Sequence, residues 1–424
     1  MDRLKQAVSL IESGNFEKGL TELKEVRKEA DHESLYDLSN IYYSLGLIED
    51  SRDVVEELLI HYPNEGELLV QAAECYVDLE QEQDAIAALN KIDENDAAYP
   101  PALLLLADLY QTEGLEEVAE QKLLEAKRLS PDEPIIDFGL GEFYLTQGHH
   151  LKAVPYYEAV LGTKGELANE NIEIRLAEAL SGSGQFEDAL TYYEKGLENA
   201  REINALFGYG FTALQINEYR KAINAFNELK ELDPQYSTLY PYLAKAYEEE
   251  GAVAEAIEVL AEGIKFDEFN EELYIQASRL TFKTHDNASG EQYLRELLAI
   301  NPAHIEAAKT LAAYLKTEER YEDILDLLRN IEEGEQSDPY LDWSAATAYA
   351  QVEEYKDAIK RYENAYTYFR QDPIFLEEYG AFLIEEGRRE EAVKAFKLAL
   401  ELDPSLVHLE EEILRFDEET FKED

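Results

Sequence analysis

Apolar residues recur at steps of three and four positions along this chain, which is the period of an α-helix. The pattern is clearest between Pro373 and Leu406, a 34-residue unit whose two apolar stripes are separated by Gly387 and ended by Asp403–Pro404. It predicts two short helices joined by a turn near Gly387. Because a lone helical hairpin of this size cannot bury its apolar stripe, it needs neighbouring hairpins to pack against.

The same unit repeats back to the N-terminus, which divides the chain into twelve helical hairpins. Most steps between equivalent positions are 34 residues long, with one step of 33 and one of 36. Each hairpin is expected to contact only its neighbours, which predicts an all-α solenoid rather than several separate domains. The units after the first begin at His32, Gly66, Pro100, Pro134, Glu170, Ile203, Ser237, Glu271, Ile305, Pro339 and Pro373.

Two positions of the unit carry a size pattern. Position 11, on the first helix, is tyrosine in half of the units. Position 20, on the second helix, is small in every unit except the one with Ile324, because the two helices of a hairpin approach closely there. The small residues are Gly19, Ser51, Ala85, Ala119, Ala153, Ala189, Ala222, Ala256, Gly290, Ala358 and Ala392.

This alternation of small and large residues resembles the tetratricopeptide repeat (TPR) over residues 1 to about 406. The resemblance implies a right-handed superhelix of hairpins whose concave inner surface binds partner polypeptides. It also implies a non-enzymatic scaffold or adaptor, although a repeat fold by itself does not specify a function.

We expect repeats 1–5 over residues 1–169, repeats 6–12 over residues 170–404 and an acidic capping helix over residues 405–424. Pro155 should kink the second helix of repeat 5 or delay its start. The connector at 162–165 follows, so the superhelix is predicted to change pitch near residues 155–170. The terminal helix carries Leu406, Leu409, Ile413 and Phe416 on one side; it should cap the array, or alternatively fold into the groove as a peptide mimic.

The chain is strongly acidic, with 93 Asp and Glu against 38 Lys and Arg and a net charge of −55. This charge disfavours nucleic acid and anionic membranes as partners. It also has a simpler explanation, since acidic surfaces keep a long solenoid soluble. No apolar run approaches the roughly 20 residues of a membrane span, and no signal peptide is apparent, so the simplest expectation is a cytoplasmic protein.

Motifs for catalysis, metal binding or cofactor binding are not found in the sequence. The seven histidines are scattered, and carboxylates are too frequent to indicate a site. The single cysteine, Cys75, is expected in the core. Trp343 could be a ligand platform or part of the packing. We therefore expect no enzyme activity, no cofactor and no metal.

Around the first helix, positions 4, 7, 8 and 11 form the core sector, and positions 2, 5, 9, 12 and 13 lie opposite. In the proteins that this chain resembles, that opposite sector lines the concave surface. Reading along it predicts an acidic first half, an apolar waist and a basic patch, with no base in repeats 3–6. The candidate partner-binding residues are Asn40, Glu74, Asp108, Glu142, Glu178, Phe138, Phe207, Phe211, Lys245, Arg279, Lys283, Lys309 and Lys316.

Repeats 3–6 would then bind a basic segment, and repeats 8–10 an acidic residue or a C-terminal carboxylate. Two simpler interpretations stay open: the acidic row could be a solvated face, and Glu248, Glu249, Glu272 and Glu306 could neutralise the basic patch. Two other functions also stay open, a self-assembling structural protein and a regulatory or chaperone-like subunit of one enzyme complex.

Overall fold

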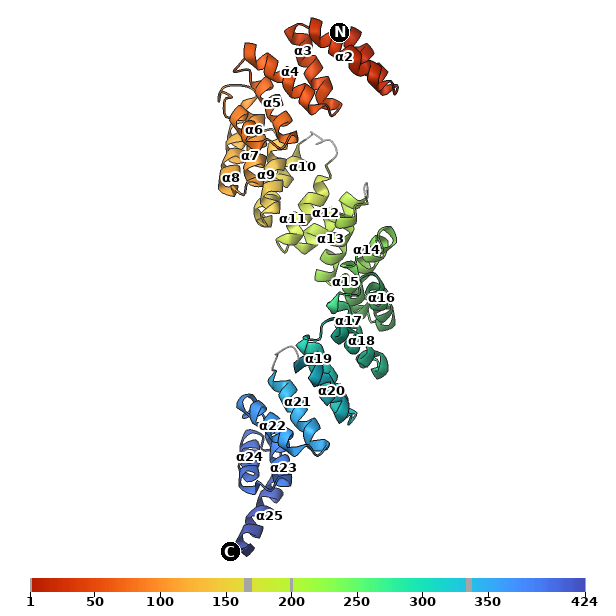
Figure 1. The fold of residues 1–424 in the computed structure, drawn as a ribbon, viewed down its shortest axis with the longest axis vertical. Helices are drawn as coiled ribbons and strands as arrows, with labels where there is room; N and C mark the ends of the chain where they lie inside the picture. The colour runs from red at the N-terminus through yellow and green to blue at the C-terminus, as the bar shows by residue number, and fades with distance from the viewer. Residues whose placement is uncertain (1, 164–169, 199–200, 333–337, 424) are drawn as a thin grey trace. The chain divides into compact units, whose positions relative to one another are not determined.

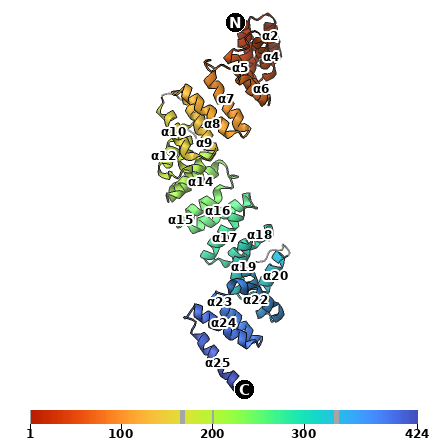
Figure 2. The same ribbon diagram turned by 90° about the vertical axis from the view of Figure 1, so that its left-hand side faces the viewer.

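The computed structural model describes residues 2–163, 170–198, 201–332 and 338–423, and they form 25 helices and no strand. The chain falls into two compact units, Met1–Ile216 and Asn217–Asp424, and each is described by itself. Successive helices within a unit form antiparallel hairpins (Figures 1 and 2). The predicted all-α solenoid of paired helices is confirmed.

The first unit contains thirteen described helices, which make six hairpins and the first helix of the seventh. They are α1 (Asp2–Glu12), α2 (Phe16–Glu29), α3 (His32–Ser44), α4 (Ile48–His61), α5 (Gly66–Asp78), α6 (Glu82–Leu89), α7 (Tyr99–Thr112), α8 (Glu116–Leu129), α9 (Pro134–Thr146), α10 (His150–Gly162), α11 (Ile172–Gly182), α12 (Phe186–Leu197) and α13 (Ile203–Gln215).

The second unit continues with the second helix of the seventh hairpin, five further hairpins and a terminal helix. These are α14 (Tyr219–Leu232), α15 (Leu239–Glu249), α16 (Val253–Phe266), α17 (Glu271–Lys283), α18 (Asn287–Ile300), α19 (Ile305–Thr317), α20 (Tyr321–Glu332), α21 (Pro339–Gln351), α22 (Tyr355–Phe369), α23 (Pro373–Glu385), α24 (Arg389–Leu402) and α25 (His408–Glu423).

The turn inside each hairpin repeats one backbone motif. In the last hairpin, Gly387 has a positive φ of 75° and the Arg388 N–H bonds to the Leu383 carbonyl at 2.8 Å. This six-to-one bond satisfies a carbonyl that the helix end would otherwise leave open. The equivalent residue has positive φ in every hairpin, and it is not glycine at Glu80, Asn217, His285, Glu319 and Glu353.

The small residues at position 20 lie where the two helices of a hairpin touch, and those residues are all buried. At Gly19 a Cβ atom would come within 2.9 Å of the Ala7 backbone oxygen, so the close approach is real. Ile324, the exception, is itself fully buried among leucines. Cys75 is also buried, as predicted, and burial raises the pKa of its thiol.

The repeat 5 region differs in part from expectation. Pro155 lies inside α10 on the exposed side, and α10 still begins at the usual position, so the predicted delay of its start is wrong. The predicted connector at 162–165 lies partly outside the described residues. The predicted change of pitch near 155–170 stays a prediction.

Helix α25 follows the last hairpin and packs on it. Leu409 and Ile413 are buried against the cluster that contains Phe396 and Ala399 of α24. Leu414, on the other side of α25, is 62% exposed. The side chain of Phe416, which the sequence places on the apolar side of this helix, lies outside the described residues.

Candidate functional site

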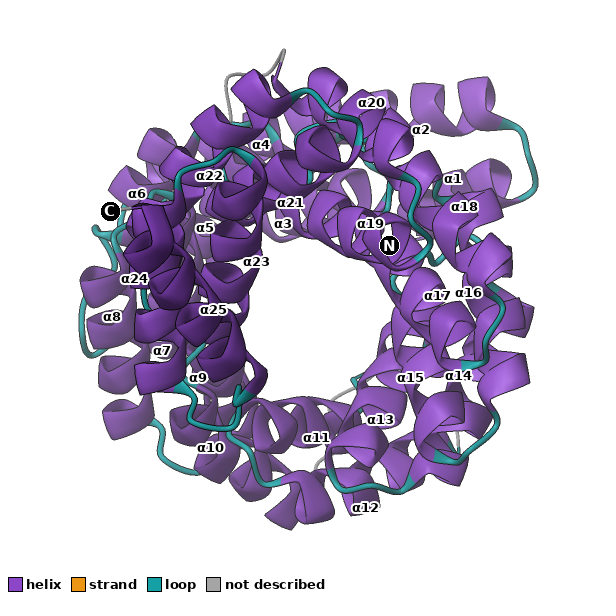
Figure 3. Cartoon of the chain, turned by 90° about the horizontal axis from the view of Figure 1, so that it is seen from below, coloured by secondary structure: helices purple, strands orange, loops and turns teal. Residues whose placement is uncertain are grey.

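The first helices of successive hairpins share one face of each unit. In the first unit α3, α5, α7, α9 and α11 lie on one side and α4, α6, α8, α10 and α12 on the other (Figure 3). In the second unit α15, α17, α19, α21 and α23 are arranged in the same way. We call the surface that these first helices form the inner face. It carries the candidate residues predicted from the sequence.

Two parallel stripes run along the inner face of the first unit. Position 5 supplies an apolar stripe, in which each side chain packs on the core and stays partly accessible; its members are Tyr36, Val70, Leu104 and Phe138. Position 9, one helical turn further on, supplies the polar stripe; its members are Asn40, Glu74, Asp108 and Glu142. The two stripes are neighbours because residues four apart lie on the same side of a helix.

Glu74 and Asp108 keep their charge available. Neither carboxylate takes part in an ion pair among the described residues, and Asp108 is exposed. Glu74 is half-buried, and burial, together with the nearby Asp78, raises the pKa of its carboxyl group. An acid held partly out of water without a counter-ion gains most from an external cation.

The other two predicted acids are already paired. Arg175 of α11 lies between them, with Nε 3.3 Å from Glu142 Oε1 and Nη1 3.1 Å from Glu178 Oε2. The Tyr157 hydroxyl also donates to Glu142 at 2.6 Å. The expectation that repeats 3–6 offer no base at this surface is therefore wrong, and the unpaired part of the acidic row is Glu74 and Asp108.

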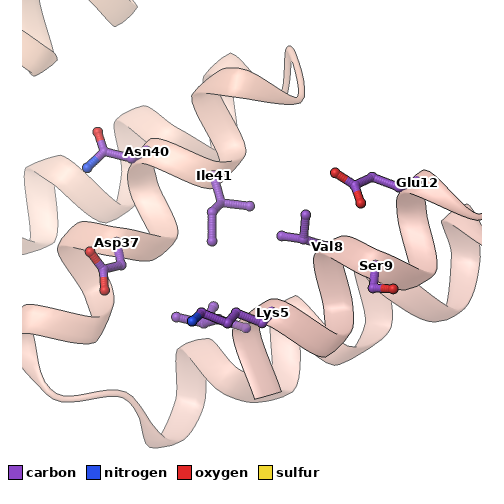
Figure 4. Close-up of a pocket in the computed structure, with 8 residues that line it drawn as sticks. Lys5, Val8, Ser9, Glu12, Asp37, Asn40 and Ile41 are labelled. Carbon is purple, nitrogen blue, oxygen red and sulfur yellow. The ribbon is translucent and has the colours of Figure 1, made fainter. Parts of the chain in front are cut away.

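Asn40 extends the polar stripe toward the N-terminus. The Gln71 amide, buried and held by Ser39, donates to Asn40 Oδ1 at 2.8 Å, which fixes the orientation of the Asn40 side chain. Asn40 also lines a cavity of about 420 Å³ between α1 and α3. Figure 4 shows Val8 and Ile41 converging in that cavity, with Lys5 beneath them.

The predicted apolar waist is partly core. Phe138 packs on the first unit's core, with its ring 6.3 Å from the Tyr157 ring. Phe207 and Phe211 on α13 are half-buried and both make contacts. Leu214, which the sequence placed beside them, is 5% exposed and belongs to the interior.

The predicted basic patch is partly neutralised at its centre. Glu248 of α15 accepts from Arg279 at 2.8 and 2.5 Å and from Lys283 at 3.0 Å. The hydrogen bond from Arg279 is the main reason that the pKa of Glu248 falls to about 2. The simpler interpretation, neutralisation by Glu248, holds in part, because one carboxylate engages both bases and cancels one of their two positive charges.

The remaining bases differ in their surroundings. Lys316 Nζ lies 2.8 Å from Glu378 Oε2 and 5.2 Å from the Trp343 ring centroid. Lys309 lies 3.9 Å from Glu306 and 5.8 Å from the Tyr340 ring centroid. Lys245 is exposed, and no ion pair involves it within the part of the chain that the structure describes.

Trp343 is part of the packing. Its ring lies 5.2 Å from Phe369 and 5.3 Å from Phe375, and its indole N–H is buried without a hydrogen-bond partner among the described residues. Of the two interpretations of Trp343, a part of the packing or a ligand platform, these contacts support the first.

Sequence reasoning missed the residues at position 6 of the unit. Position 9 of one repeat meets position 6 of the next, as in the pairs Asn40–Gln71, Glu142–Arg175 and Thr347–Glu378. The helical wheel alone assigned position 6 to neither sector. Comparing position 9 with position 6 of the following unit could have found Arg175, because the two carry opposite charges.

The described ranges lack the features of a metal-binding site and of a membrane-spanning helix. They contain no group of three or more His, Cys, Asp or Glu side chains that could hold a metal ion. None of the helices formed by these residues combines the length and the apolar character that a membrane crossing requires.

Stacked helical hairpins with a small residue at the close approach in all but one hairpin define a helical repeat protein of the TPR class. Family models agree: a tetratricopeptide repeat model matches residues 4–66, 36–102, 174–237 and 210–271. Models described as YpiA-like tetratricopeptide repeats and their C-terminal counterpart match residues 111–165 and 339–405. The chain belongs to the tetratricopeptide repeat family.

One relative is similar over nearly the whole length. The TPR repeat-containing protein YpiA of Bacillus subtilis (strain 168) is 42% identical over 416 residues, which cover 98% of both chains. The TPR repeat-containing protein MJ1428 of Methanocaldococcus jannaschii is 27% identical over 178 residues, 42% of this chain and 28% of that protein.

Solved structures are more distant. A tetratricopeptide repeat protein from Parabacteroides merdae has a TM-score of 0.42 at 16% identity, covering 58% of this chain and 97% of that one. YrrB, described as a TPR protein with an unusual peptide-binding site, has a TM-score of 0.38 at 14% identity, covering 44% and 95%.

Proposed function

We propose that this protein is a non-enzymatic adaptor that binds a partner polypeptide along the inner face of its first unit. Membership of a repeat family whose members bind peptides or proteins supports the general class. The observation that carries the specific proposal is the pair Glu74 and Asp108, two carboxylates without an ion pair in the described part of the chain, beside the apolar stripe of Val70 and Leu104. A segment that alternates basic and apolar residues matches both stripes.

The spacing of the stripes is compatible with an extended segment. Equivalent helices of neighbouring hairpins stand at least about one helix diameter apart, roughly 10–12 Å, so carboxylates at equivalent positions of α5 and α7 should recur at about that interval. An extended chain advances about 3.3 Å per residue, so a basic residue at every third position would keep register with the acids. Apolar residues between them would face position 5.

The proposal does not extend to the basic patch of the second unit. Arg279 and Lys283 are engaged by Glu248, so binding an acidic ligand there would first require these ion pairs to break. Cytoplasmic location also stays a prediction from the sequence.

The test is a double charge reversal, Glu74→Lys with Asp108→Lys, assayed with a synthetic peptide that carries Arg at every third position and Leu between. We expect the dissociation constant to rise at least about tenfold, which corresponds to a loss of about 1.4 kcal/mol. The matched control, Asp84→Lys with Glu117→Lys, makes the same charge change in the same repeats on α6 and α8. Binding that survives the first pair, or falls equally with both, would contradict the proposal.

Light scattering of the unliganded protein at low and high salt tests the alternative of self-assembly. A mass that falls to that of the monomer as salt rises would favour self-assembly. A constant monomer mass agrees with an adaptor.

A further inference from the structure

A second cavity lies at the edge of the inner face, where α3, the end of α4 and the start of α5 meet. It has a volume of about 300 Å³ and is lined by His32, Glu33, Tyr36, Leu58, Tyr62, Glu65, Glu67 and Leu68. At roughly 30 Å³ per water molecule it holds the volume of about ten waters. One or two side chains of a partner fit such a space, and a helix does not.

The lining has three layers of different chemistry. Leu58 and Leu68 are 2% and 5% exposed and form an apolar floor. The rings of His32, Tyr36 and Tyr62 contribute aromatic walls. Three exposed glutamates, Glu33, Glu65 and Glu67, also line the cavity. Neither Lys nor Arg appears in the lining that the structure describes.

The aromatic walls are held in place by their own contacts. The Tyr62 hydroxyl lies 2.9 Å from His32 Nδ1, and the two rings meet edge to face at 89° with their centroids 5.4 Å apart. The His61 ring stacks on the His32 ring at 4.7 Å. Tyr62 remains 45% exposed although it is fixed in this way, so its ring is presented to a ligand without having to move.

Aromatic rings beside carboxylates attract one kind of group, an organic cation. A cation over a ring interacts with the negative charge of its face, and the carboxylates add Coulomb attraction and hydrogen-bond acceptors. A planar guanidinium can stack on a ring and still donate hydrogen bonds to carboxylates at its edge, which an ammonium group cannot do equally well.

We propose that this cavity receives an arginine side chain of the partner polypeptide. The inference rests on the proposed function in taking that arginine from the partner's basic segment. Tyr36 belongs both to this cavity and to the position-5 stripe, so a segment bound on the inner face passes the mouth of the cavity. The arginine anchors the segment at repeats 2 and 3, and Glu74 and Asp108 align the residues that follow.

A single-residue probe tests the cavity apart from the stripe. N-acetyl-arginine methylamide carries the cation, and N-acetyl-citrulline methylamide has the same shape without the charge. Each probe is titrated into the full-length protein, and the NMR shifts of His32 and Tyr62 are followed. The arginine probe should bind saturably, and the citrulline probe should bind at least about fivefold more weakly. Equal binding of both probes, or no saturable shift for either, would overturn the proposal.

Two variants locate the binding. Tyr62→Leu, and Glu65→Gln combined with Glu67→Gln, should each weaken binding of the arginine probe about fivefold. All three residues are exposed, so these variants should fold, and a circular dichroism spectrum checks this. Glu117→Gln on α8 is the control. Wild-type affinity in both variants would place the cation elsewhere and contradict the assignment.

The charge-reversal variant of Glu74 and Asp108 separates this inference from the proposed function. We expect it to bind the arginine probe as the wild type does while losing the long peptide. Loss of the probe from Tyr62→Leu without loss of the peptide from the charge-reversal variant would leave the cavity standing and reject the stripe. Peptide binding that depends on Glu74 and Asp108, with no probe binding at all, would reject the cavity alone.

Discussion

At the scale of single residues, Glu248 determines what the second unit presents on its inner face. Arg279 is 53% exposed and Lys283 is 56% exposed at the side chain, whereas Glu248 is only 12% exposed and lies between them. Glu248, which is mostly buried, therefore holds the two accessible bases Arg279 and Lys283 in one ion-pair network. The surface that the sequence predicts as basic therefore carries less positive charge in the fold, because Glu248 cancels one of the two charges of Arg279 and Lys283.

The first prediction concerns Glu248→Gln, which should lower the free energy of unfolding at pH 7 by about 1 kcal/mol, the upper range for exposed ion pairs. The pKa of Glu248 falls from an ordinary value of 4.5 to about 2, so this stabilisation is present above pH 4.5 and is lost as the pH falls toward 2. Urea unfolding should therefore separate variant and wild type at pH 7 and much less at pH 3. Glu249→Gln, one position along, is the control, and an equal effect of both changes would contradict the role given to Glu248.

Turn residues show a second effect at this scale. Position 15 requires a left-handed backbone in every hairpin, and glycine adopts it without the steric cost that a Cβ atom brings. Around Gly46 and Gly387 nothing lies within 4 Å of where a Cβ would be, so only backbone conformation distinguishes residue types there.

The second prediction is that Glu319→Gly stabilises the hairpin of α19 and α20 by about 1 kcal/mol, because Glu319 has a positive φ of 55°. Amide hydrogen exchange of those two helices measures the local free energy of opening. Glu318→Gly is the matched control; its φ is −90°, so glycine gains nothing there and should slightly destabilise the helix end. Stabilisation by both changes would show that backbone strain is not the cause.

At the scale of elements, each hairpin depends on what its neighbour covers. The hairpin of α23 and α24 is followed by the single helix α25, which buries Leu409 and Ile413 against α24. These contacts agree with the prediction that α25 caps the array, since terminal elements of a repeat array must cover the apolar face that an internal repeat would bury.

The third prediction compares two leucines on that helix. Leu409→Ala removes a side chain that is 2% exposed and should reduce the local stability of α24 and α25 by roughly 2–4 kcal/mol. Leu414→Ala removes one that is 62% exposed and should change little. Hydrogen exchange in α23, α24 and α25 reports the difference. Similar protection in the two variants would mean that α25 does not cap the array.

At the scale of the whole molecule, net charge is the dominant electrostatic property. The 93 acidic residues exceed the 38 basic ones by 93 − 38 = 55, so 55 negative charges remain uncompensated even if every base is paired. When salt is added, the stability gained from weaker repulsion among these charges should exceed the stability lost from weaker ion pairs. Salt at 0.1 M largely screens exposed charges that lie farther apart than the Debye length of about 10 Å.

The fourth prediction follows from that imbalance: the thermal unfolding midpoint should rise when NaCl increases from about 20 to 300 mM, as screening weakens the repulsion among carboxylates. Calorimetry measures the midpoint. KCl should act equally, because screening depends on ionic strength rather than on the identity of the cation. A midpoint that falls with salt would show that ion pairs outweigh repulsion.

The sequence by itself determined the hairpins. Helix period, the small residue at position 20 and the turn at position 15 are local signals, because each depends on residues within one unit or on the packing of its two helices. For this reason the starts of α3, α5, α9 and α23 coincide with those expected. Burial of Cys75 followed from the same pattern.

Only the tertiary structure decided which charges are available. Arg175 forms ion pairs with Glu142 of the preceding repeat and with Glu178 on its own helix, and Glu248 engages bases one repeat away. The partners in different repeats, Glu142 with Arg175 and Glu248 with Arg279, lie more than 30 residues apart in sequence, and their meeting depends on how one hairpin is rotated against the next. A helical wheel describes one helix at a time. It predicted which side chains point away from the core of each first helix, and it could not give the contacts between neighbouring helices that leave Glu74 and Asp108 without an ion pair among the described residues.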